Sequence, residues 1–308
     1  MNRLKTIINK IARKLLRLYR CYLNFISSLS DAIQYQRSLR QLKPNRQKDT
    51  KLAVIIHLYY TDNWSLFVKK LANLNNFKHD IFVTIPDKNI FFIKEIKAAY
   101  PSASIIIVPN RGRDVLPFVK VAGKLSKMGY EYVLKFHSKK STHRDDGQEW
   151  LEAMLNKLLP DKKSVIDKTK SILADVNTGV IGPEGFYYPL TINFPANGEH
   201  MTTAVKKIYN NDIAYKYLQS NRGDYGFFGG TMFWVRLDAI DNLLHFPIYY
   251  FEAEHGQIDG TFPHALERLF GVIPEIENKI NYEINSSMVL KRPYASDNIP
   301  DWSEDHLK

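Results

Sequence analysis

Cysteine is nearly absent from this sequence, since Cys21 is the single one among 308 residues. One thiol cannot close an internal disulfide or complete a cysteine-rich zinc site, so a disulfide-stabilised scaffold and a zinc-finger module are excluded. A protein without a redox requirement is expected in the cytoplasm. The chain also lacks a Gly-x-Gly-x-x-Gly fingerprint and a P-loop sequence, so no motif supports a dinucleotide-dependent dehydrogenase or a P-loop ATPase.

Acidic residues are scarce at the N-terminal end. Residues 1–48 contain 12 Lys and Arg but a single acid, Asp31, whereas the other 260 residues contain 31 residues of each sign. The first segment therefore carries the whole formal net charge of +11. Because the body has no net charge, a protein built around a nucleic-acid surface is excluded. The ordinary globular composition, with 44% hydrophobic residues, suits one large α/β domain or two small ones.

The first 30 residues have the pattern of an amphipathic basic helix. Apolar side chains recur at spacings of three and four, with Lys and Arg between them. These apolar residues are Leu4, Ile7, Ile8, Ile11, Leu15, Leu18, Tyr22, Phe25, Ile26 and Leu29. Seven basic residues among the first 20 exclude a membrane-spanning helix, which needs about 20 nearly uncharged residues, and the recurring charges exclude a signal peptide. We expect a helical arm at residues 1–36 and a linker at 37–50.

This arm has three possible partners. An anionic membrane surface is favoured, with residues 1–30 lying in the interface, because their cations have no matching acidic excess in the body. Alternatively, the helix packs on the protein's own body and leaves a solvated basic face. Nucleic acid ranks last, because the chain has no base-reading module. The favoured interpretation predicts a cytoplasmic protein that is peripheral on the inner face of the plasma membrane.

Beyond residue 50, apolar runs alternate with helically spaced segments. Buried strands are predicted at residues 51–58, 79–85, 103–108 and 130–136, and helices at 64–74, 90–100 and 115–128. Further helices are predicted at 150–159, 163–176, from Leu237 and at 263–270, and further strands at 179–182 and 227–235. This alternation predicts an α/β fold whose mostly parallel sheet is flanked by helices.

Ligands of such sheets bind beyond the carboxyl ends of the strands. The side chains predicted there are rich in hydrogen-bonding groups and cations, as a phosphorylated ligand requires. They are His57, Tyr59 and Tyr60 after the first strand, Asp87 after the second, Asn110, Arg111, Gly112, Arg113 and Asp114 after the third, and His137, Lys139 and Lys140 after the fourth. The alternative for the third group is a helix cap, Asp114, with solvated arginines. The alternative for the two lysines is ordinary surface charge.

Two C-terminal stretches also offer chemistry. Residues 251–261 carry three carboxylates and a histidine, and Asp259 near the head of the next helix is placed to act as a general base. The alternative is that Asp259 and Thr261 cap the helix, with Glu267 and Arg268 on the surface. The paired glycines of residues 227–234 permit close approach of a sugar ring or form a tight packing bend.

Four motifs, in this order, resemble the rhamnan synthesis protein F family of polysaccharide-assembly glycosyltransferases. They are NRGRDVLPF from Asn110, KFHSKKSTH from Lys135, FFGGTMFWVR from Phe227 and EHGQIDGTFPHALERLFG from Glu254. The resemblance extends from about residue 51 to residue 274, and the layout is similar to that of GT-A sugar transferases. It implies a GT-A-like domain at 51–308, with a nucleotide-binding half at 51–145 and an acceptor half at 146–308.

The resemblance also implies roles for individual residues. Asp87 contacts the base of the nucleotide, Asn110 and Gly112 match the donor-side turn, and Asp259 is the general base, with Glu254 as the second choice. The acceptor side corresponds to Gly229, Gly230, Thr231, His264 and Arg268. The Asp-x-Asp that holds a divalent metal in such enzymes is replaced by His137-Ser138-Lys139, so Lys139 or Lys140 can supply the charge instead and metal dependence stays open.

The activity implied is transfer of a sugar, rhamnose or another deoxyhexose, from a nucleotide-sugar donor to a lipid-linked cell-surface polysaccharide, with inversion. The alternative is a noncatalytic GT-A-like scaffold or carbohydrate-binding protein of polysaccharide assembly, which the missing Asp-x-Asp favours.

Overall fold

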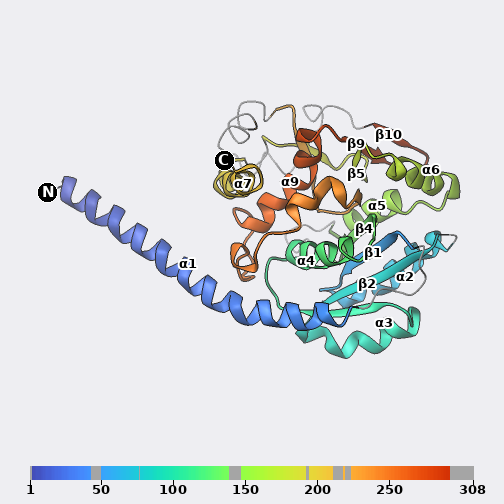
Figure 1. Cartoon of the computed structure of the whole chain (residues 1–308), viewed down its shortest axis with the longest axis horizontal. Coiled ribbons are helices and arrows are strands. Elements are labelled where there is room, and N and C mark those ends of the chain that lie inside the picture. Colours follow the sequence, from blue (N-terminus) through green and yellow to red (C-terminus); the bar gives the residue numbers. More distant parts are fainter. Residues whose placement is uncertain are drawn as a thin grey trace.

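The computed structural model describes residues 2–42, 50–75, 77–138, 147–191, 194–210, 218 and 223–291. In this part of the chain, an α/β body carries a long N-terminal helix, α1 (Asn2–Arg40), whose first half projects away from the body (Figure 1). The predicted fold class, a mostly parallel sheet flanked by helices and preceded by a helix, is confirmed.

The main sheet of the described residues has eight strands in the order β10-β9-β5-β8-β4-β1-β2-β3. Neighbours are parallel in four of the seven pairs, and the antiparallel pairs are β4 with β8, β5 with β8, and β9 with β10. The strands are β1 (Leu52–His57), β2 (His79–Pro86), β3 (Ser104–Val108), β4 (Tyr132–His137), β5 (Thr178–Pro183), β8 (Phe233–Arg236), β9 (Ile280–Ile284) and β10 (Val289–Lys291). A separate two-stranded antiparallel sheet pairs β6 (Tyr187–Pro189) with β7 (Gly226–Phe228).

Helices cover both faces of this sheet and bury its apolar side chains. They are α2 (Trp64–Leu71), α3 (Ile93–Ala99), α4 (Val115–Ser126), α5 (Gly147–Leu158), α6 (Lys163–Ala174), α7 (Phe194–Tyr209) and α9 (Phe262–Ile276). One core lies under α4, α7 and α9 and includes Tyr35 of α1. The other lies under α2, α5 and α6. Strands buried on both sides in this way are expected to read as continuous apolar runs, as β1 does.

The first four predicted strands are confirmed. The pairing register of β1 with β2 and β4 places the carboxyl ends of these strands side by side. His57 at the end of β1 is opposite Thr84 of β2 on one side and His137 of β4 on the other. Side chains that follow these strands therefore share one edge of the sheet.

The strand predicted at 227–235 is wrong, because the chain turns at Gly229–Met232 and divides it into β7 and β8, which belong to different sheets. The helix predicted from Leu237 is a short 3-10 segment, η4 (Asp238–Leu243). Helix α7 and strands β6, β9 and β10 were not predicted from the sequence.

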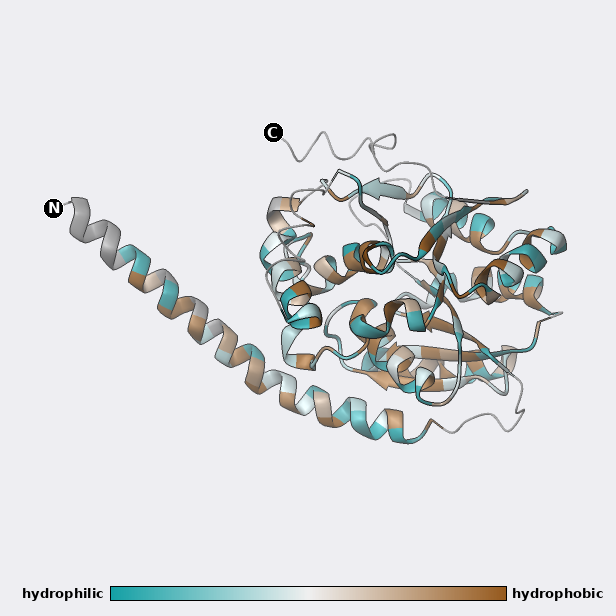
Figure 2. Ribbon diagram, turned by 45° about the horizontal axis from the view of Figure 1, so that its top comes forward, coloured by the Kyte–Doolittle hydropathy of each residue, from teal (hydrophilic) through white to brown (hydrophobic). Residues whose placement is uncertain are grey.

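The helical arm continues to Arg40, beyond the predicted start of the linker at residue 37. The added turn is stabilised by the body: Ser38 donates a hydrogen bond to the carbonyl of Ile107 (2.8 Å), and Leu42 lies in the core. Residues 43–49 of the predicted linker lie outside the described residues. Figure 2 shows brown apolar positions along most of the projecting helix. No helix in the described part of the chain combines the length and the apolarity that crossing a membrane requires.

Candidate functional site

A buried charged cluster lies where β1 and β4 end. Lys135 of β4 donates from Nζ to Oδ2 of Asp114 (2.6 Å) and to the carbonyl of Thr231 (2.5 Å). The hydroxyl of Thr231 donates to the same carboxylate oxygen at 2.7 Å, and His137 donates from Nε2 to the carbonyl of Gly230 at 2.6 Å. This buried cluster, Asp114, Lys135, His137 and Thr231, ties the start of α4 to the turn between β7 and β8. It therefore joins the two predicted halves of the domain.

Burial and the charges of this cluster shift the pKa values of Asp114 and of His57. Burial alone would raise the pKa of Asp114, but His137, Lys135 and the hydrogen bonds from Lys135 and Thr231 outweigh it and hold that pKa well below the usual carboxyl range. The carboxylate is therefore ionised at neutral pH. Burial, with a smaller contribution from the Lys135 cation, lowers the pKa of His57 to about 4 against the attraction of Asp114. His57 is therefore a neutral ring, hydrogen-bonded through Nδ1 to Thr84 Oγ1 at 2.9 Å.

A second cluster, Arg113, Glu254, Asp259, His264 and Arg268, lies beside the first. Arg113 donates from Nη1 to His264 Nε2, and its Nε is 3.6 Å from a carboxylate oxygen of Glu254. Arg268 donates to Oδ2 of Asp259 at 3.3 Å and to the carbonyl of His264 at 2.8 Å. Residues predicted for the donor and acceptor sides are thus in direct contact.

The imidazole of His264 is oriented from both sides. Because Nε2 accepts from Arg113, the neutral ring carries its proton on Nδ1, which lies 2.7 Å from the hydroxyl of Thr261 and 3.9 Å from Asp259 Oδ1. The ring therefore links the cation of the donor-side turn to the predicted general base.

Backbone pairing holds the donor-side turn against the acidic segment. Arg111 and Ala253 form an isolated antiparallel bridge, Gly112 donates to the carbonyl of Glu252 at 3.1 Å, and Glu254 donates to the carbonyl of Asn110 at 3.4 Å. The side chain of Asn110 is exposed. The paired residues are about 140 positions apart, so the sequence pattern does not predict this pairing.

The guanidinium of Arg111 does not face the two clusters. Its Nε donates to Asp31 (2.5 Å), Nη1 to Asn24 (2.6 Å) and to the carbonyl of Phe251 (2.7 Å), and Nη2 to Ser27 (2.6 Å). Three of these acceptors belong to α1, and the side chain is only 2% exposed. The solvated arginine of the helix-cap alternative is therefore wrong for Arg111, whose guanidinium is held by α1 and by the carbonyl of Phe251.

The capping alternatives for Asp114 and Asp259 are also wrong. Asp114 occupies the N-cap position of α4 without a capping hydrogen bond, because its carboxylate binds Lys135 and Thr231. The first amide of α9, from Phe262, instead donates to Glu252 at 3.0 Å. Asp259 is thereby left to pair with Arg268.

Glu267 and Arg268 are not on the surface, contrary to the alternative considered. The side chain of Arg268 is buried over the ring of Phe227, and Glu267 accepts from the amide of Gly230 at 2.8 Å. The space beside the glycine pair is filled by the protein's own aromatic rings. A Cβ on Gly229 would lie 2.6 Å from Tyr188, and one on Gly230 would lie 2.4 Å from Trp150. The tight packing bend is therefore the better account of these glycines in this structure.

Strained backbone concentrates in the same place. Four described residues other than glycine have positive φ, and the two that are not asparagine are Arg113 (57°) and Thr231 (50°). Such conformations persist where surrounding contacts enforce them, and they are frequent at functional sites. Each of these residues belongs to one of the two clusters.

Asp87 and Tyr59 follow the ends of β2 and β1, outside the two clusters. Asp87 is exposed and accepts a hydrogen bond from Gln34 of α1 at 2.9 Å. The ammonium of Lys88 lies 3.5 Å from the centre of the Tyr59 ring. The amides of Tyr59 and Tyr60 both donate to the hydroxyl of Ser138, at 2.7 and 2.8 Å, which connects the ends of β1 and β4.

The described residues of the site do not form a metal site. Among the described residues, no group of three or more His, Cys, Asp and Glu side chains is arranged to hold a metal ion. At the Asp-x-Asp position, His137 binds the Gly230 carbonyl and Ser138 binds two amides. Lys139 and Lys140, the predicted diphosphate cations, lie outside the described residues.

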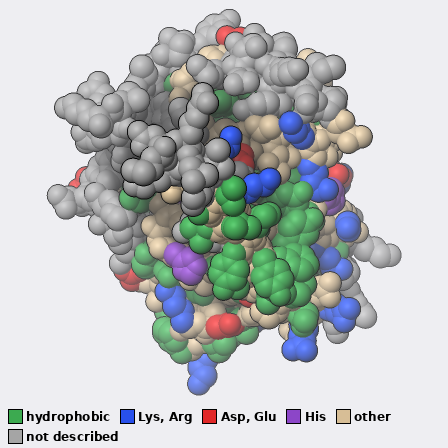
Figure 3. Space-filling model, turned by 90° about the vertical axis from the view of Figure 1, so that its left-hand side faces the viewer, with side chains coloured by type: hydrophobic (Ala, Val, Ile, Leu, Met, Phe, Trp, Pro, Cys, Tyr) green, Lys and Arg blue, Asp and Glu red, His purple; other side chains and the backbone are tan. Residues whose placement is uncertain are grey.

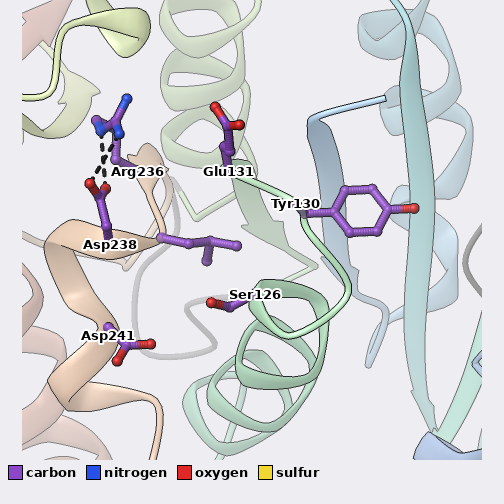
Figure 4. Close-up of a pocket in the computed structure, with 7 residues that line it drawn as sticks. Ser126, Tyr130, Glu131, Arg236, Asp238 and Asp241 are labelled. Atoms are coloured by element: carbon purple, nitrogen blue, oxygen red, sulfur yellow. Dashed lines mark hydrogen bonds and ion pairs between the residues drawn. The ribbon is translucent and has the colours of Figure 1, made fainter. Parts of the chain in front are cut away.

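A pocket at the opposite edge of the sheet, at the amino end of β4, shares no residue with these clusters (Figure 4). It is lined by Ser126, Tyr130, Glu131, Arg236, Leu237, Asp238 and Asp241. Its Arg236 is paired with Asp238 at 3.0 Å. The strand-end rule does not place a ligand there.

The sequence analysis did not predict the contacts of three residues of the site. Lys135 had a recognisable signal, a single cation inside the apolar run of β4. Glu252 and Glu267 had none, because their roles depend on backbone amides that only folding brings near.

Two comparisons with known proteins bear on this site. A family model described as "Rhamnan synthesis protein F" matches residues 10–278. The chain is also similar to "Uncharacterized protein WxcX" of Xanthomonas campestris pv. campestris, in strains B100 and ATCC 33913, with 34% identity over 228 residues. The match covers 71% of this chain and 30% of WxcX, so the chain spans less than a third of that relative's length.

Proposed function

Because the chain belongs to the rhamnan synthesis protein F family, and so has a role in polysaccharide synthesis, we propose that it is a glycosyltransferase with a GT-A-like fold. The donor is a nucleotide sugar carrying rhamnose or another deoxyhexose. The acceptor is a lipid-linked cell-surface polysaccharide.

One observation carries this proposal: Arg113, from the donor-side turn, contacts Glu254 of the acidic segment 251–261 and His264 of α9. A transferase needs a cation near the leaving diphosphate and a base near the acceptor hydroxyl, a few ångströms apart. The two clusters bring such groups to the carboxyl edge of the sheet, where α/β proteins bind ligands.

The mechanism is a single displacement. Asp259 removes the proton from an acceptor hydroxyl while that oxygen forms a bond to the anomeric carbon. The bond from this carbon to the diphosphate breaks, and the nucleoside diphosphate leaves with the electron pair. Arg113, whose side chain is 31% exposed, stabilises the leaving charge, and the configuration inverts. Arg268 and His264 orient the base. Arg111 is given no role at the diphosphate, because α1 holds its guanidinium.

Nucleotide use can be tested directly. Thermal unfolding of the full chain with a panel of nucleotide sugars, each with and without Mn²⁺, should show stabilisation by at least one donor. A ligand at a hundredfold excess over its Kd stabilises by about 2.7 kcal/mol. Absence of a shift with every donor, together with absence of donor hydrolysis, would refute the transferase.

A noncatalytic scaffold or carbohydrate-binding protein is the second candidate. The aromatic rings against Gly229 and Gly230 favour the noncatalytic scaffold, since they occupy space that an acceptor sugar would use. The replacement of Asp-x-Asp favours it as well. Such a protein would bind oligosaccharide without responding to nucleotide sugars, so the same panel separates the two.

The proposed location follows from the acceptor. A lipid-linked polysaccharide places the enzyme on the inner face of the plasma membrane, as a peripheral cytoplasmic protein. We propose no nucleic-acid partner, since the body has no net charge.

A further inference from the structure

Helix α1 docks on the body through a polar stripe. The residues that face the body recur at spacings of three and four; they are the polar residues Asn24, Ser28, Asp31 and Ser38, together with the aromatic residue Tyr35. Asn24 donates to the carbonyl of Tyr249 at 3.0 Å, and Asp31 pairs with Arg111. Only towards the end of the helix do apolar residues join the core, notably Tyr35.

The apolar stripe of the same helix consequently faces away from the body. Tyr22, Ile26, Leu29 and Ile33 each precede a body-facing residue by two positions, and two positions are about 200° around an α-helix. Their side chains are 61%, 46%, 48% and 51% exposed. A helix on a globular surface normally buries its apolar stripe and exposes its polar one. Here the arrangement is reversed, although the helix is docked.

The exposed stripe continues along the projecting segment. Ile11, Leu15 and Leu18 are all more than half exposed. The 22 residues before Asn24 correspond to about 33 Å of helix. Figure 3 views the molecule from this side and shows hydrophobic side chains gathered into one patch, with Lys and Arg along its margin. Tyr249 extends the patch onto the body, since its ring lies 6.0 Å from Phe25.

Charge identifies the occupant of this face. Residues 1–30 contain seven Lys and Arg and no acid. A second copy of the helix would bring the same cations together without acidic partners, which disfavours self-association. We propose that the apolar face of α1 binds the surface of a membrane containing anionic lipids, with the basic residues at the headgroups.

The docking contacts give this membrane contact a fixed orientation. Arg111 holds three α1 side chains and is part of the same turn as Arg113. The membrane plane then lies on the side of α1 opposite the body, and the two clusters of the site stand at a set position above it. In the proposed function this is where a lipid-linked acceptor is presented.

Vesicle binding tests the proposal without requiring transferase activity. Cys21 is exposed and is the only cysteine, so a polarity-sensitive fluorophore on it reports insertion of the helix. Labelled full chain should bind vesicles of equal parts phosphatidylcholine and phosphatidylglycerol, with a blue shift, and bind pure phosphatidylcholine much more weakly. Raising the salt concentration should weaken binding.

Variants identify the face. Leu18→Ser with Tyr22→Ser should lower the partition coefficient by at least about tenfold, because burial of each side chain is lost. Val176→Ser, which changes a side chain 60% exposed on the body, should bind as the wild type does.

Equal binding by the double variant and the wild type, or no binding by the wild type, would overturn the proposal. A wild-type dimer that the double variant breaks, without vesicle binding, would assign the face to a second copy instead. Nucleotide-dependent stabilisation is expected in all variants, so failure here is distinguishable from failure of the proposed function.

Discussion

Arg111 and Asp31 form an ion pair between segments 80 residues apart, with Nε 2.5 Å from Oδ2. The arginine belongs to the donor-side turn and the aspartate is the single acid among the first 48 residues. The lone acid of a cationic arm is thus the residue that fastens the arm to the body. A buried guanidinium needs a counter-charge, so this position is constrained by electrostatics as well as by packing.

Loss of this ion pair should destabilise the fold. Asp31→Ala leaves the guanidinium of Arg111 with neutral acceptors only, and it should lower the free energy of unfolding by about 2–4 kcal/mol. Gln34→Ala, which removes an exposed hydrogen bond to Asp87 on the same helix, should cost less than about 1 kcal/mol. Urea denaturation measures both. If both variants lost the same free energy of unfolding, the ion pair would contribute no more than the exposed hydrogen bond.

His57 should make stability depend on pH. Its pKa is about 4 in the folded protein and about 6.5 when unfolded, so between these values the unfolded state binds more protons. Stability should therefore fall as pH is lowered from about 6.5 to 4, by roughly 2–3 kcal/mol from this group. His57→Gln should flatten the curve of unfolding free energy in that window. An unchanged slope in the variant would contradict the prediction.

Asp114 and Lys135 should be strongly coupled. Either Asp114→Asn or Lys135→Met alone leaves a buried charge without its partner and should cost about 3–5 kcal/mol. The double variant removes both charges, so its cost should be lower than the sum of the single costs by at least about 2 kcal/mol. A double-mutant cycle from denaturation curves provides the measurement. Additive costs would mean that the pair contributes little beyond its surroundings.

Asp259 and Glu254 can be separated by activity. If Asp259 is the base, Asp259→Asn should reduce the transfer rate by about 10²–10⁴-fold while stabilisation by the nucleotide sugar is retained. Glu254→Gln should have a smaller effect, because its contact is with Arg113 rather than with the acceptor side. Asp241→Asn, at the opposite edge of the sheet, serves as the control with wild-type activity. Full activity in Asp259→Asn would exclude this base.

Local patterns predicted the regular part of the fold well. The apolar runs of β1 to β4 and the helices between them are where their periodicity placed them, because a sheet buried on both faces needs such runs. A tight packing bend was one of the two interpretations of the glycine pair, but the division of the predicted strand 227–235 was missed, since the sequence does not reveal that its two halves pair with different partners. Which of the candidate site residues contact one another could not be predicted, because those contacts join segments far apart in the sequence.

The sequence by itself determined that the N-terminal residues form an amphipathic basic helix and that the candidate residues follow the strands. Periodicity assigns residues to faces of a helix, and strand ends in a parallel sheet share an edge. Only the tertiary structure decided that α1 docks through its polar stripe, that Arg111 turns to Asp31 and that Lys135 turns to Asp114. These pairings depend on which distant segments pack together, and desolvation then makes a charged partner necessary at each buried cation.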